Sequence, residues 1–171
     1  LSRGREIIPL EQEICHVRSY LDIQKMRYGD RLDYQIQIPE ELKKLYTVKL
    51  LIQPLAENSI YHGIKESDRK GTILITAGEE TGGFYLCVRD DGLGITPETL
   101  TILNADLKRG VTVSDGGYGI FNVNERVRLY FGRDYGLELR SCAGEWTEAV
   151  IHLPKYIPER TEWDVSDFDR R

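Results

Sequence analysis

Three short stretches, in a fixed order along 171 residues, constrain this chain more than any other feature. Residues 51–63 read as an apolar helix whose end carries an amide and an imidazole. Residues 88–95 read as a strand that runs into carboxylates and glycines, and residues 116–126 as a glycine loop that opens another helix. Together they predict a nucleotide pocket, although none of the three would indicate one alone.

Hydrophobic periodicity predicts how the elements around these stretches are arranged. Helices are expected at about 9–28, 48–62, from 96, and 118–131, and strands at 32–38, 72–77, 84–90, 137–141 and 148–153. Most strands are neighbours in sequence, so we expect an α+β fold: a two-layer α/β sandwich with a mixed, mostly antiparallel sheet and helices on one face. Pro54 should kink its helix or mark the first turn, and Gly63 should end it. Residues 104–116 have the composition of a mobile loop.

Composition narrows the class of protein. The net charge of −5 argues against non-specific nucleic-acid binding, which needs basic side chains against phosphate. Three widely spaced cysteines form neither a disulfide framework nor a zinc site, which fits a cytoplasmic domain. No apolar run approaches a membrane span, and because the first residue is Leu we expect a piece of a longer protein.

Asn58 and His62 are four residues apart, so on a helix they share a face. An amide in an apolar helix needs a partner, and a hydrated Mg²⁺ bridging phosphates would supply one. The alternative is a polar pair at a helix end, bonded to nearby backbone.

Asp90 ends an apolar strand and is followed by glycines. A carboxylate there can accept a hydrogen bond from an exocyclic amine, and glycines let the backbone approach a planar ring. The alternative is an ordinary Asp-Gly turn. The glycines of 116–119 open a helix whose free amides could hold phosphate, unless they are simply a flexible loop. They match neither a Walker A motif nor a dinucleotide fingerprint.

The order of these motifs resembles the ATP-binding fold shared by histidine kinases, type II topoisomerases, heat-shock chaperones and mismatch-repair ATPases. Residues 57–63 resemble its asparagine box, 90–95 its first glycine box, 117–126 its second, and 144–154 its closing strand. The upstream segments 9–13 and 20–32 resemble bacterial sensor histidine kinases of the LytS/YesM-like group.

The resemblance implies roles for individual residues. Asn58 would ligate Mg²⁺ and act in catalysis, and Asp90 would accept the adenine amine. His62 would lie near the ribose or base, and Thr147 near the adenine. Lys108 and Arg109 would belong to a lid over the phosphates. The other residues expected to contact ATP are Gly63, Gly92, Gly94, Ile95, Gly117, Tyr118, Gly119 and Ile120.

It also implies a division of the chain and a set of partners. Residues 1–30 would be a connector helix, 31–155 the ATP-binding catalytic domain, and 156–171 an acidic tail. The γ-phosphoryl group would pass to a histidine on the kinase's own dimerisation helices, which are expected outside this chain, and then to a response regulator. The parent protein is expected to be a homodimer in the bacterial cell membrane.

Two other functions remain open. Relatives that hydrolyse ATP to drive a clamp place a glutamate one helical turn before the asparagine, where this chain has Pro54. A nucleotide-binding interaction module without chemistry is also possible, although the intact motifs favour a kinase. Many kinases of the wider family carry a phosphate-contacting lysine at the position of Tyr61, and this chain departs from that pattern.

Overall fold

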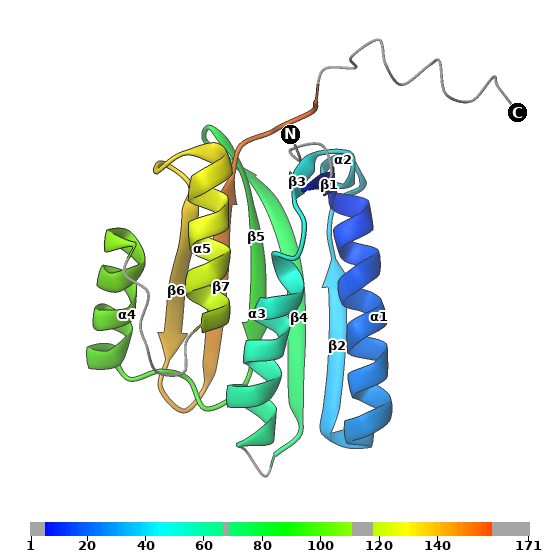
Figure 1. The fold of residues 1–171 in the computed structure, drawn as a ribbon. Helices are drawn as coiled ribbons and strands as arrows, with labels where there is room; N and C mark the ends of the chain where they lie inside the picture. Colours follow the sequence, from blue (N-terminus) through cyan, green and yellow to red (C-terminus); the bar gives the residue numbers. More distant parts are fainter. Residues whose placement is uncertain (1–5, 67–68, 111–117, 159–171) are drawn as a thin grey trace, which may run out of the picture.

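The structure, a computed structural model, describes residues 6–66, 69–110 and 118–158. Its main element is a five-stranded sheet with the strand order β2-β4-β5-β7-β6. Helices α1, α3 and α5 lie along one face of this sheet, and α4 lies beside β6 (Figure 1). The expected two-layer α/β sandwich is therefore confirmed.

The sheet is mixed, as its sequence pattern predicts. Only the edge pair β2–β4 is parallel, and the other neighbouring pairs are antiparallel. A two-residue turn at Thr81 and Gly82 joins β4 to β5. The strands are β2 (Leu32–Gln37), β4 (Gly71–Glu80), β5 (Gly83–Asp90), β6 (Gly136–Cys142) and β7 (Trp146–Leu153).

The helices follow the expected order, with differences at their ends. They are α1 (Leu10–Tyr28), the short α2 (Glu40–Lys43), α3 (Ile52–Ser59), α4 (Pro97–Arg109) and α5 (Tyr118–Phe131). A 3-10 turn at Gly29–Arg31 follows α1. No helix in the described ranges is long and apolar enough to span a lipid bilayer.

A small second sheet was not expected from the sequence. Strands β1 (Ile7–Pro9) and β3 (Tyr46–Val48) pair antiparallel beside the start of α1. Each strand has three residues, which is too short to display a period of two. Residues 40–46 thus contain α2 and the first residue of β3.

The asparagine helix differs from its predicted boundaries at both ends. It begins at Ile52 rather than near 48, so Pro54 lies in its first turn, where no helical N–H is lost. Gly63 does not end it, because the chain continues as a π-helix over Ile60–Lys65. Glycine is needed at this position for packing instead. A Cβ at Gly63 would lie 2.8 Å from Oδ1 of Asp90, so only glycine allows the two residues to approach this closely.

Helix α4 is much longer than the short helix expected after residue 96. Leu100, Leu103 and Leu107 follow helical spacing and pack against the core. The helix ends at Gly110, whose φ of 72° is left-handed and whose N–H bonds to the Asp106 carbonyl. Most of residues 104–110 is therefore helix rather than loop, and residues 111–117 lie outside the described ranges.

The core lies between the sheet and its helices. Burial alternates along β4, so one face of that strand is buried and the other is half-exposed. Two asparagines fasten the helices to β6. Asn104 of α4 donates to the Leu139 carbonyl at 2.8 Å and accepts from the Leu139 N–H at 2.9 Å. Buried Asn124 of α5 donates to the Leu107 carbonyl and accepts from the Leu137 N–H, both at 2.9 Å.

Candidate functional site

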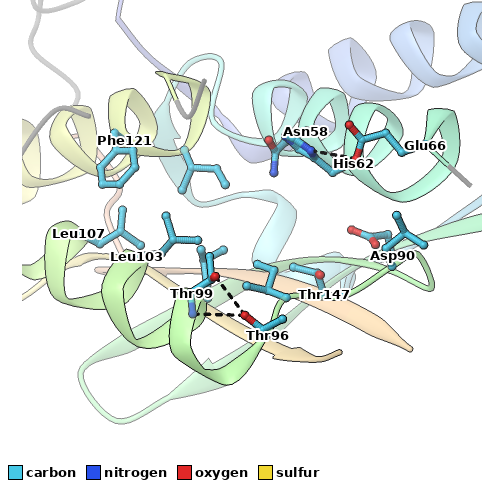
Figure 2. Close-up of a pocket in the computed structure, with 15 residues that line it drawn as sticks. Asn58, His62, Glu66, Asp90, Thr96, Thr99, Leu103, Leu107, Phe121 and Thr147 are labelled. Carbon is cyan, nitrogen blue, oxygen red and sulfur yellow. Dashed lines mark hydrogen bonds and ion pairs between the residues drawn. The ribbon is translucent and has the colours of Figure 1, made fainter. Parts of the chain in front are cut away.

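A cavity of about 430 Å³ opens between the end of the sheet and helices α3, α4 and α5. Asp90 and Thr147 line it from β5 and β7, while Asn58 and His62 project from α3 and its continuation (Figure 2). The segments that the sequence separates thus meet around one space. Its volume suits a small-molecule ligand.

Asp90 is the most enclosed polar side chain of this cavity, with 5 % of its surface exposed. Its Oδ1 accepts the Gly92 N–H at 3.1 Å, and the Ser59 hydroxyl of α3 also bonds the carboxylate. Burial raises the pKa of Asp90, and the bonds from Ser59 and Gly92 oppose that rise. A carboxylate offers about four acceptor positions, so capacity remains for a donor in the cavity.

Glycines shape the backbone around this carboxylate. A Cβ at Gly92 would lie 2.3 Å from the Cα of Gly63, and both glycines press against Asp90. Gly94 has a φ of 67°, and a Cβ there would lie 2.0 Å from the Cys142 carbonyl oxygen. Gly63 and Gly92 therefore support Asp90 from behind, whereas Gly94 and Ile95 line the cavity itself.

Thr147 is held by a short hydroxyl network at the start of β7. Ser141 donates to the Trp146 carbonyl at 2.6 Å and accepts the Ile95 N–H at 2.8 Å. The Ser141 and Thr147 hydroxyl oxygens are 3.2 Å apart. Because Ser141 has already used its one proton, Thr147 is the donor in this pair. Thr147 consequently offers only lone pairs to a ligand.

Asn58 and His62 form the opposite wall. Within the described ranges the Asn58 amide has no protein hydrogen-bond partner, and it lines the cavity. His62 Nδ1 lies 3.5 Å from a carboxylate oxygen of Glu66. Mg²⁺ accepts one or two protein oxygens and completes its shell with water and phosphate, so a free amide oxygen fits it. The described residues contain no cluster of three acidic, histidine or cysteine ligands.

An apolar wall, which was not predicted from the sequence, completes the cavity. Leu103 and Leu107 come from α4 and Phe121 from α5 (Figure 2). Leu139 of β6 also lines it. The three-and-four spacing of the α4 leucines was the available signal, but the expected loop hid it. Thr96, which caps α4 by accepting the Thr99 N–H, lines the same side.

The remaining expected residues have different outcomes. Ile120 lines the cavity, and Gly119 lies 3.8 Å, measured from an added Cβ, from Pro54 of α3. Lys108 and Arg109 belong to the last turn of α4, not to a loop, and neither lines the cavity. Arg109 is instead paired with Asp106.

The second glycine box is only partly described. Tyr118 is the first residue of α5, and Gly117 lies outside the described residues. The amides of 111–117 are therefore no part of the geometry described above.

Comparison with known proteins agrees with this geometry. Residues 45–157 match the family model described as histidine kinase-, DNA gyrase B-, and HSP90-like ATPase. The chain belongs to this ATPase family. Residues 1–32 match a second model, described as histidine kinase, and this range includes helix α1.

Three relatives of this domain are named as sensor kinases or sensor proteins. It is 33% identical over 150 residues to the sensor histidine kinase YesM of Bacillus subtilis, which covers 88% of this chain and 24% of YesM. It is 31% identical over 157 residues to the sensor protein LytS of Bacillus anthracis, covering 91% and 26%. The sensor histidine kinase BtsS of Escherichia coli is 33% identical over 154 residues, covering 90% and 25%. The chain thus spans about a quarter of these relatives.

Solved structures share the fold of the domain. The catalytic domain of histidine kinase ThkA aligns with a TM-score of 0.65 at 15% identity, over 87% of this chain and 94% of that chain. Acinetobacter baumannii histidine kinase AdeS aligns with a TM-score of 0.59 at 15% identity, over 89% and 68%. These likenesses establish the histidine kinase ATPase architecture.

Proposed function

We propose that this domain binds Mg-ATP and supplies the γ-phosphoryl group to a histidine on the dimerisation helices of its parent kinase. The phosphoryl group would then pass to a response regulator, and the parent would act as a membrane-bound homodimer. The observation that carries the proposal is the meeting of a buried acceptor, Asp90, and the Asn58 amide, which no other described residue bonds, on opposite walls of one cavity.

Hydrogen-bond acceptors of the protein would recognise the adenine base of ATP. Adenine presents an exocyclic amine, and the Asp90 carboxylate has acceptor capacity beyond its bonds to Ser59 and Gly92. Leu103, Leu107 and Phe121 supply the apolar surface against which a flat base can pack. Asp90 and the apolar wall thus account for the base without any lid residue.

The phosphate end would be held on the side of α3 and α5. Asn58 would take one position in the shell of Mg²⁺, which would neutralise phosphate charge during transfer. The attacking imidazole nitrogen forms a P–N bond to the γ-phosphorus as the bond to the β–γ bridging oxygen breaks. ADP leaves with that electron pair, and the imidazole loses its proton to solvent. The chain's contribution is to position the nucleotide.

Calorimetric titration tests binding, and labelling tests transfer. The chain should bind ATP more tightly with Mg²⁺ than with EDTA, and Asn58→Ala should remove most of that difference. In the parent kinase, label from γ-phosphate-labelled ATP should appear on a histidine and disappear in Asn58→Ala.

Other results would contradict the proposal. Steady release of phosphate without labelled protein would favour an ATP-hydrolysing clamp. Failure to bind ATP would remove the proposal altogether. Because His16 lies exposed on α1, His16→Gln should keep the label, and its loss there would make His16 the acceptor.

A further inference from the structure

The backbone just before α3 adopts a costly conformation. Leu50 has a φ of 58°, and no other non-glycine residue in the described ranges has a positive φ. A leucine side chain is disfavoured in this left-handed region because its Cβ approaches the following carbonyl. Leu50 is 42 % exposed, so burial of its own side chain does not explain why the conformation persists.

A side chain from α1 holds this junction. Glu13 is 1 % exposed, and its Oε2 accepts the Leu50 N–H at 2.9 Å. Its Oε1 accepts the Leu51 N–H at 2.6 Å and the Ile52 N–H at 3.0 Å. Three amides supply the compensation that a buried carboxylate requires.

Two of these amides, Leu51 and Ile52, are free donors at the start of α3, and the third, Leu50, immediately precedes them. The N-cap position is Leu51, and no side chain of the cap residue bonds the first turn. Caps normally come from a neighbouring Ser, Thr, Asp or Asn in the same segment. Here the cap comes from another helix, 37 to 39 residues earlier in the chain.

A second helix grips the same residue from its other side. The Leu50 carbonyl accepts from Nη1 of Arg126 on α5 at 3.4 Å. Arg126 also lies 3.5 Å from Glu6, which pairs with Lys49 at 2.9 Å. Leu50 is therefore fixed between the connector helix and the helix that follows the second glycine box.

We propose that Glu13 is a positioning residue, which fixes the start of α3 and thereby the place of Asn58 relative to Asp90. This inference rests on the proposed function. Asn58 lies six residues beyond Ile52 on the same helix, about 9 Å along its axis. Asp90 and Thr147 stand on the paired strands β5 and β7, and the Gly92 N–H also holds Asp90. Because, within the described ranges, only the Ser59 bond ties Asp90 to α3, a change at Glu13 should move the amide more than the base-binding end.

The test uses the whole chain and the ratio between the ATP dissociation constants in EDTA and in Mg²⁺. Glu13→Gln keeps the size of the side chain but turns one acceptor atom into a donor that faces an N–H. The ratio should fall at least about fivefold, since one charged hydrogen bond at the cap is lost. The dissociation constant in EDTA should change less than about twofold, because the sheet and the Gly92 N–H still hold Asp90 in place.

Two matched variants separate positioning from folding. Glu11→Gln alters an exposed glutamate in the same first turn and should leave the ratio unchanged. Leu50→Gly accepts a φ of 58° without steric cost, so adding it to Glu13→Gln should restore most of the ratio.

Amide hydrogen exchange without nucleotide reports directly on the three hydrogen bonds that Glu13 accepts. Leu50, Leu51 and Ile52 should be protected in the wild type and exchange faster in Glu13→Gln. An unchanged ratio, an equal loss in EDTA and Mg²⁺, or no rescue by Leu50→Gly would overturn the inference. If the exchange behaves as expected but the wild type binds no ATP, the proposed function is wrong, and so is the role of Glu13 toward Asn58. The stabilisation of the start of α3 by Glu13 would still hold.

Discussion

Asp90 and Thr147 lie directly opposite each other on the antiparallel strands β5 and β7. Cross-strand partners project to the same face of a sheet, so both side chains reach the cavity from its floor. Asp90 is an acceptor when ionised, and Thr147 has committed its proton to Ser141. This floor therefore favours a ligand edge that donates hydrogen bonds.

A base with an amine at this edge should be preferred over one with a carbonyl. We expect the chain to bind ATP at least about 100-fold more tightly than GTP, because unpaired buried polar groups discriminate strongly. Asp90→Asn should weaken ATP binding and narrow this ratio, since an amide can donate to a carbonyl. Calorimetry with both nucleotides measures the effect. Asp91→Asn is the control, because Asp91 is exposed and bonds Thr72 N–H instead. Equal ATP affinity in Asp90→Asn and the wild type would contradict the assignment.

The raised pKa of Asp90 predicts a specific pH dependence of stability. A carboxyl whose pKa is higher in the folded than in the unfolded state favours folding when protonated and loses that contribution as pH rises. At pH 7 the ionised Asp90 therefore reduces the free energy of unfolding, and Asp90→Asn should be at least as stable as the wild type. The advantage should shrink as the pH falls toward the unfolded pKa of about 4. Thermal unfolding across this range checks it, and an Asn variant much less stable at pH 7 would refute it.

The same titration should appear in binding. Protonated Asp90 loses acceptor capacity, so ATP affinity should fall as the pH drops through its pKa, which lies above the ordinary aspartate value. This fall in ATP affinity should occur in the wild type and not in Asp90→Asn, because all other titrating groups are common to both proteins. Parallel pH profiles for the two proteins would exclude Asp90 as the group that reads the base.

Gly94 is required for two reasons that substitution can separate. Gly144 has a φ of 81° with nothing within 4 Å of an added Cβ, so Gly144→Ala carries the conformational cost alone, about 1 kcal/mol. Gly94→Ala adds a Cβ 2.0 Å from the Cys142 carbonyl oxygen, which should cost at least ~2 kcal/mol more. Urea denaturation of both variants gives the difference. Equal losses would mean that the backbone near Gly94 moves freely.

Asn124 should matter for stability far more than its neighbour on α5. It is 1 % exposed and bonds the backbone of both α4 and β6. Asn124→Ala leaves the buried Leu137 N–H unpaired and the Leu107 carbonyl with only its 3.3 Å bond from the Gly110 N–H, so the free energy of unfolding should fall by about 1–3 kcal/mol. Asn122→Ala, on the exposed face of the same helix, should change it by less than about 0.5 kcal/mol. A loss of less than about 0.5 kcal/mol in Asn124→Ala would show that water replaces these hydrogen bonds.

The sequence predicted the elements whose patterns are local. Helix α1, strand β2 and the β4–β5 hairpin have clear periods, and the polar residues of the cavity stood out as amides and carboxylates in apolar segments. The predicted end of helix α4 was too early, because the residues around Lys108 and Arg109 have the composition of a loop. Gly110 has the left-handed conformation of a helix cap and marks the true end. That error also concealed the apolar wall.

Other features depend on contacts distant in the chain. The bond from Leu50 to Glu13 spans 37 residues, and no spacing rule for a single helix reveals it. The β1–β3 pair likewise forms only because the fold brings two three-residue segments together. Gly63 was expected to stop a helix, yet its contact with Asp90 explains its presence better. In each case tertiary packing overrode a local rule.

The two hydrogen bonds between Asn104 and the Leu139 backbone also affect how copies of the domain can associate. Strand β6 is the last strand of the sheet, and its outer side would otherwise present free N–H and C=O groups to any passing chain. Asn104 occupies both groups of Leu139 at the middle of that strand. A second copy therefore finds no continuous ladder to extend, and α4 protects the domain from edge-to-edge aggregation while it walls the cavity.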